Sequence, residues 1–200
     1  PGEYREVYDM IVDESKNQVR LLSPFGSLYT YDLEGNFIKQ NQLPEKSNYQ
    51  AMEQIGDNIM TWTIPVSSDE PCITIVNADN GKEVSSLWKG PRILNSLSGG
   101  SFYTYDGKTY FAPAFHNNEI LEITEDSLKL AYKWDFGKDN IDISKYNFTL
   151  TDDNQAEEGR LMTDYLGNGT IPYLLGSQYQ NSKYFYVCFS YGWFPNQTIK

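Results

Sequence analysis

The feature that most constrains the fold is a repeated pattern of short alternating segments separated by polar turns. The first unit contains YDMIVD, the turn ESKN, QVRLLS and the hairpin SLYTYDLEGNFIKQ, which together predict four strands in a meander. A lone hairpin is marginally stable in water, so these strands need neighbours to pack against. Matching first turns occur at Asp13, Asp57 and Asp106, 44 and 49 residues apart. Units of about 40–50 residues with four strands are typical of propeller blades.

The pattern therefore predicts an all-β fold, a β-propeller of four-stranded antiparallel meander blades, with about three and a half blades in this chain. We treat residues 1–200 as one partial propeller domain with blades near residues 8–41, 49–88, 101–135 and 171–200. Residues 147–170 form a polar, acidic insertion that contains a short helical pattern. Because a propeller must close to protect its edges, we expect either a segment of a longer chain or self-association through open blade edges.

Composition supports this fold and excludes one class of partner. Aromatic residues make up 15% of the chain, and aromatic side chains suit pleated, half-buried surfaces. They serve either as core or as a binding face. The formal net charge is −11 with no cluster of Lys or Arg, so we expect no nucleic-acid partner. No apolar run reaches the length of a transmembrane helix, so we expect no membrane span.

The residues needed for common catalytic and metal sites are sparse. The chain has one histidine and two cysteines, too few for a zinc site, and no G-x-S-x-G nucleophile motif. No run follows the alternating carboxylate pattern of a calcium loop, and no glycine-rich phosphate loop opens a helix. We therefore predict no catalytic residues, no metal and no cofactor. The 27 acidic residues nevertheless leave a glycosidase-type carboxylate pair open.

The two ends of the predicted blades differ in composition. Turns between first and second strands, and between third and fourth, are short and polar. The loops between second and third strands carry proline and aromatic residues, among them Phe25, His116 and Trp193. Aromatic side chains with a polar rim are typical of binding sites, so we predict that these three residues contact a ligand. The alternative is that they cover the ends of the blade cores.

Several segments resemble a known family. PGEY at Pro1–Tyr4, residues 10–39 (MIVDESKNQVRLLSPFGSLYTYDLEGNFIK) and residues 110–138 (YFAPAFHNNEILEITEDSLKLAYKWDFGK) resemble six-bladed, NHL-like β-propellers of exported or lipid-anchored proteins in Bacteroides-type bacteria. The resemblance covers most of residues 1–140 and, more weakly, 171–194. It implies export to the periplasm or cell surface, and it carries no catalytic set. The chain departs from the family in lacking a lipoprotein cysteine and a visible ring-closing strand.

Three functional hypotheses follow. The first is a non-enzymatic binding or scaffold module at a bacterial cell envelope that recognises a glycan, a peptide or a protein. The second is a carbohydrate-active hydrolase or lyase, because propellers also host such chemistry and fold alone does not decide function. The third is recruitment of a partner strand by β-augmentation at an open blade edge. The sequence favours the binding module.

Overall fold

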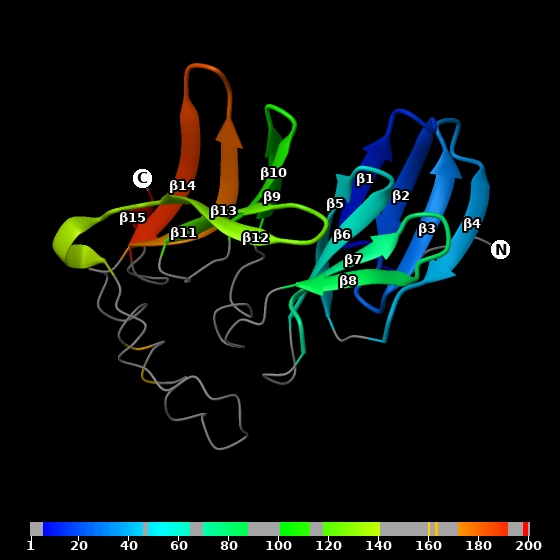
Figure 1. Ribbon diagram of the computed structural model, residues 1–200, viewed down its shortest axis with the longest axis horizontal. Coiled ribbons are helices and arrows are strands. Elements are labelled where there is room, and N and C mark those ends of the chain that lie inside the picture. The colour runs from blue at the N-terminus through cyan, green and yellow to red at the C-terminus, as the bar shows by residue number, and fades with distance from the viewer. Residues whose placement is uncertain are drawn as a thin grey trace. The chain divides into compact units, whose positions relative to one another are not determined.

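The computed structural model describes residues 6–45, 48–64, 70–87, 101–112, 118–140, 160, 163, 172–191 and 198–199. The regular secondary structure among these residues is almost exclusively antiparallel β-strand (Figure 1). The strands make four sheets, each built from neighbours in sequence order. The chain divides into two compact units, Pro1–Lys89 with Glu125–Ser127, and Gly90–Thr124 with Leu128–Lys200.

The first sheet is the meander β1 (Asp9–Asp13), β2 (Gln18–Leu22), β3 (Ser27–Asp32) and β4 (Phe37–Gln42). The turn before β2 ends at Asn17, whose φ of 51° is tolerated by asparagine. The turn before β4 is fixed by Asp32, whose Oδ1 accepts a hydrogen bond from the Asn36 amide at 2.7 Å. Local turn chemistry therefore sets where these strands begin and end.

The second sheet contains β5 (Tyr49–Ile55), β6 (Asn58–Thr63), β7 (Ile73–Asn77) and β8 (Glu83–Leu87) in that order. Its two middle strands are buried along most of their length, which matches their nearly continuous apolar and threonine sequence. The outer strand β8 is exposed or half-buried at every position. Burial thus falls from the middle of the sheet to its edge.

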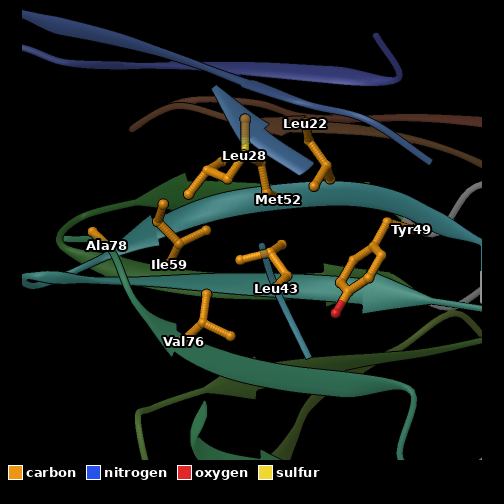
Figure 2. Close-up of a cluster of buried hydrophobic side chains, with 8 residues drawn as sticks. All are labelled: Leu22, Leu28, Leu43, Tyr49, Met52, Ile59, Val76 and Ala78. Atoms are coloured by element: carbon orange, nitrogen blue, oxygen red, sulfur yellow. The ribbon is translucent and has the colours of Figure 1, made fainter. Parts of the chain in front are cut away.

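The core of the first unit lies between these two sheets (Figure 2). Three leucines from the first sheet and its exit segment meet five residues of the second sheet, and Ile11 packs against them. The cluster consists of Leu22, Leu28, Leu43, Tyr49, Met52, Ile59, Val76 and Ala78. Burying side chains of this size contributes roughly 1.5–3 kcal/mol each, so this contact is what holds the two sheets together.

Polar contacts add to the contact between the two sheets. Asp9 Oδ2 accepts a hydrogen bond from the Met52 amide at 2.7 Å. The buried guanidinium of Arg20 donates to Gln54 Oε1 at 3.3 Å. These bonds fix β5 beside the first sheet in one register, because a slip by one residue would break both of them.

The second unit contains the remaining two sheets. One is β9 (Ser101–Tyr105), β10 (Lys108–Ala112), β11 (Glu119–Ile123) and β12 (Leu128–Lys133), followed by the short 3-10 helix η1 (Gly137–Asp139). The other is β13 (Pro172–Gln180), β14 (Phe185–Tyr191) and β15 (Thr198–Ile199).

Aromatic side chains form the core of the second unit. Tyr103 and Tyr110 stack with ring centroids 5.0 Å apart, and Phe185 from β14 meets Tyr103 edge-on at 6.1 Å. Val187 and Phe189 pack against the same cluster. From composition alone, aromatic residues could serve either in the core or on a binding surface. These aromatic residues lie in the core of the second unit.

The predicted fold class is confirmed. Three sheets have four strands, and the last has three in the described residues, in keeping with about three and a half blades. The predicted insertion at 147–170, with its helical pattern, lies outside the described residues apart from Arg160 and Thr163. Within the part of the chain that the structure describes, no helix is long and apolar enough to cross a membrane.

Candidate ligand-binding surface

Phe25 occupies the turn between β2 and β3, and its side chain is 74% exposed. Three hydrogen bonds close this turn. The Gly26 amide donates to the Ser23 carbonyl at 3.1 Å, and the Ser27 amide donates to Ser23 Oγ at 3.0 Å. The Leu43 amide donates to the Gly26 carbonyl at 2.8 Å. The exposed ring is therefore carried by a turn with a fixed backbone.

The same turn is joined to the start of the second sheet. The Tyr49 amide donates to the Pro24 carbonyl at 3.1 Å, and the buried Tyr49 ring packs against Gly26. The Tyr49 hydroxyl donates to the Pro44 carbonyl at 2.7 Å. Burial, with a smaller contribution from nearby carboxylates, raises the pKa of Tyr49, so the hydroxyl keeps its proton for this bond.

Two glutamines and a serine lie beside Phe25. Gln42 Nε2 donates to the Phe25 carbonyl at 3.1 Å, and Ser27 Oγ lies 3.3 Å from Gln42 Oε1. Gln40 Nε2 donates to Ser27 Oγ at 3.1 Å. We call Phe25, Ser27, Gln40 and Gln42 the Phe25 surface. It presents an apolar ring next to amide groups that can both donate and accept hydrogen bonds.

The two glutamines are not among the residues predicted from the sequence. Gln40 and Gln42 alternate in the run FIKQNQ, so they lie on one face of β4, and this spacing could have indicated them. Of the three predicted ligand contacts, the structure describes only Phe25, and it places this residue at the exposed end of the first sheet. His116 and Trp193 lie outside the described residues.

Residues 1–192, nearly the whole chain, match the family described as "Domain of unknown function (DUF4934)". The chain belongs to the DUF4934 family. No curated protein matches it.

Solved structures that resemble the DUF4934 chain share little sequence with it. BamB from Moraxella catarrhalis is 10% identical and aligns with a TM-score of 0.52 over 92% of this chain and 49% of that chain. Virginiamycin B lyase from Staphylococcus aureus is 15% identical, with a TM-score of 0.47 over 64% of this chain and 41% of the lyase. The computationally designed Ika4 protein is 12% identical, with a TM-score of 0.43 and coverages of 67% and 75%.

The likeness to BamB establishes the fold. BamB is a β-propeller protein, and the alignment takes in nearly all of the DUF4934 chain. The DUF4934 chain spans about half the length of that protein.

Two carboxyl groups of the DUF4934 chain, those of Asp9 and Glu53, have raised pKa values. Burial raises the pKa of Asp9 on β1 against hydrogen bonds from the Met52 and Met10 amides. Burial also raises the pKa of Glu53 on β5, and the charge of Asp9 adds to that shift. Carboxyl groups that influence each other in this way are found at catalytic sites and in structural networks alike. No group of His, Cys, Asp and Glu among the described residues could hold a metal ion.

Proposed function

We propose that this DUF4934 chain is a non-enzymatic binding or scaffold module at a bacterial cell envelope, and that it recognises a glycan, a peptide or a protein. In this proposal residues 1–200 form one partial propeller domain with residues 147–170 as an insertion. The ligand contacts the loops between second and third strands, through Phe25, His116 and Trp193.

The observation that carries the proposal is the exposed ring of Phe25 on a turn whose backbone is held by hydrogen bonds. This large apolar side chain is exposed to solvent. The backbone of the turn that carries it is hydrogen-bonded both within the turn and to the end of β4. Because the turn backbone is already held by these hydrogen bonds, a ligand that covers the ring does not have to order the turn. The neighbouring amides of Gln40 and Gln42 supply the direction-dependent contacts that select one ligand over another.

The charge of the chain restricts the class of ligand, and its family resemblance and fold bear on its cellular location. With a net charge of −11 the chain favours neutral or cationic ligands over nucleic acids and other polyanions. Export to the periplasm or cell surface is supported by the sequence resemblance to exported six-bladed propellers. The likeness to BamB, a propeller across nearly the whole chain, is consistent with this setting.

A screen for binding tests the proposal. The purified chain would be applied to arrays of neutral polysaccharides and of peptides, together with Phe25→Ala and Leu33→Ala. Leu33 is a matched control, because it is also an exposed apolar residue but follows β3 at the opposite end of the strand. We expect array signals that Phe25→Ala removes and Leu33→Ala retains. Signals that survive Phe25→Ala unchanged would contradict the assignment of this surface.

Asp9 and Glu53 favour the second candidate function, a carbohydrate-active hydrolase or lyase. A carboxyl group with a raised pKa can act as a general acid, and glycosidases pair such a group with a second carboxylate that stays ionised. The two oxygens of Asp9 already accept backbone hydrogen bonds, which favours a structural role. Turnover of a polysaccharide that is lost in both Asp9→Asn and Glu53→Gln would support the enzyme and contradict the binding module.

A further inference from the structure

The two faces of the first sheet have different surroundings. Ile11 on β1 points into the core shared with the second sheet. Its neighbours Met10 and Val12 point to the opposite face, where they are 57% and 50% exposed. Successive side chains of a strand point to opposite faces of the sheet, which explains why Ile11 and its neighbours lie on different faces. It does not explain why both faces carry apolar residues.

The exposed face is apolar across three strands. Met10 pairs with Leu21, which pairs with Tyr29, and Val12 pairs with Val19, which pairs with Tyr31. Val19, Leu21 and Tyr31 also line a shallow hollow, together with Asp32, Leu33 and Gly35. We call this surface the open face, and its residues are Met10, Val12, Val19, Leu21, Tyr29 and Tyr31. None of the six carries a charge at neutral pH.

Strand register relates the open face to a buried face of the second sheet. Met52 pairs with Thr61 as Met10 pairs with Leu21, and both methionines are on the first strand of a sheet. Met52 is 3% exposed because the first sheet covers it. Met10 at the same position is 57% exposed.

Three further positions follow the same correspondence. Val19 corresponds to Ile59 and Tyr31 to Val76, because Val19 pairs with Tyr31 in the first sheet as Ile59 pairs with Val76 in the second. Both Ile59 and Val76 are fully buried against the first sheet. Just before these strands, Tyr8 stands near the position of Tyr49 but is exposed. The open face of the first sheet thus corresponds to the face of the second sheet against which the first sheet packs.

A polar contact extends the correspondence. Asp9 bridges the two methionine amides, with Oδ1 2.8 Å from the Met10 nitrogen and Oδ2 2.7 Å from the Met52 nitrogen. The Met52 amide thereby receives a carboxylate from the neighbouring sheet. The Met10 amide donates to the carboxylate of the residue before it, within the first sheet.

We propose that the open face is a docking surface for a further four-stranded antiparallel blade. That blade presents what the first sheet presents to the second, namely a leucine pair equivalent to Leu22 and Leu28. Its leucines cover Met10 and Leu21.

The occupant is a blade from outside these 200 residues and not a second copy of the chain. In any copy the leucine pair of the first sheet is already buried against the second sheet. The last sheet of a copy would offer the exposed Tyr179 and Tyr186, which do not match a leucine pair. A chain that spans 49% of the BamB chain is also compatible with additional blades.

A duplication tests this assignment. A second copy of residues 6–48 would be inserted directly before Tyr8, so that the natural connection into the second sheet is repeated before the first. We expect a higher Tm and at least tenfold slower hydrogen exchange at the Met10 amide. The matched control carries Leu22→Asp and Leu28→Asp in the inserted copy only, and it should show neither effect. Equal protection in both fusions, or none in either, would overturn the proposal.

Light scattering on the unmodified 200-residue chain provides a measurement that does not depend on the fusion folding. We expect a monomer whose mass does not change with Leu21→Asp, because no described residue of the chain packs over Met10 and Val12 on the open face. A dimer that Leu21→Asp dissociates would assign the face to a second copy and would contradict the proposed occupant.

Discussion

Nη1 of Arg20 lies 2.8 Å from Oδ2 of Asp13, and both side chains are buried, at 0% and 5% exposed. The carboxylate also accepts hydrogen bonds from Ser15 Oγ and the Lys16 amide, which makes it both the end of β1 and the partner of a buried cation. Removing one partner of such a pair leaves the other charge buried and unpaired, which destabilises the folded state.

We therefore expect Asp13→Ala to lower the free energy of unfolding by about 3–5 kcal/mol. Arg20→Met in the same chain should restore much of it, because the pair is then replaced by apolar surface. Urea unfolding of both single variants and of the double variant measures the coupling between them. Additive losses in the double variant would show that the pair is not an energetic unit.

The same carboxylate gives an acid dependence. Burial on its own would raise the pKa of Asp13, but hydrogen bonds from Ser15 and Arg20 and the charge of Arg20 hold it below its ordinary value of 3.8. Its contribution to stability is complete above pH 3.8 and is lost as the pH falls through the lower folded-state pKa. Unfolding measured between pH 2 and pH 5 should show this loss in the wild-type chain and less of it in Asp13→Asn.

Glu53 should give the opposite pH dependence. Burial, aided by the charge of Asp9, raises its pKa above 4.5, so the folded state binds this proton more tightly than the unfolded state. Stability contributed by Glu53 is then highest below pH 4.5 and falls as the pH rises through the folded-state pKa. Glu53→Gln should raise the Tm at pH 7 and leave it nearly unchanged at pH 3.5. An equal effect at both values would rule out titration as the cause.

Gly26 and Gly35 form a matched pair for testing the Phe25 turn. Both have positive φ, 78° and 87°, so alanine is strained at either position. A Cβ on Gly26 would lie 2.8 Å from Cε2 of Tyr49, whereas one on Gly35 would meet nothing within 4 Å. Gly35→Ala should cost about 1 kcal/mol and Gly26→Ala about 1–3 kcal/mol more. Equal losses of Tm would mean that the Tyr49 contact yields at no cost.

Gln178 on β13 offers a stabilising substitution. It is 1% exposed, and neither polar atom of its side-chain amide has a hydrogen-bond partner among the residues that the structure describes. Because a buried unpaired polar group costs about 1–3 kcal/mol, Gln178→Leu should raise the Tm. A lower Tm would show that the amide is satisfied by bound water, which the substitution removes. Tyr179→Leu is the control, since the neighbouring Tyr179 is exposed.

Local sequence signals were sufficient for the strands and turns. Asp106 and Gly107 have φ values of 51° and 70°, as a two-residue hairpin between alternating segments requires. Asp13 was expected in a turn, and its bonds to Ser15 and Lys16 confirm this. These features depend on residues within a few positions of each other, so the order of residues alone determines them.

Features that depend on contacts between sheets could not be predicted. Nothing near Asp9 in the sequence indicates that its carboxylate bonds to an amide 43 residues later. Arg20 in QVRLL gives no sign that a cation is buried beside Gln54. For the candidate site, composition indicated Phe25, but the contribution of Gln42 depends on how β4 returns beside the turn.

The most direct test of the proposed function is the ratio of dissociation constants for a ligand recovered from the arrays. Titration calorimetry would compare the wild-type chain with Phe25→Ala and Leu33→Ala, all at one salt concentration. We predict at least a tenfold weaker affinity for Phe25→Ala, about 1.4 kcal/mol, and less than a twofold change for Leu33→Ala. Equal affinity for all three proteins would contradict the assignment of the binding surface to the Phe25 end of the blade.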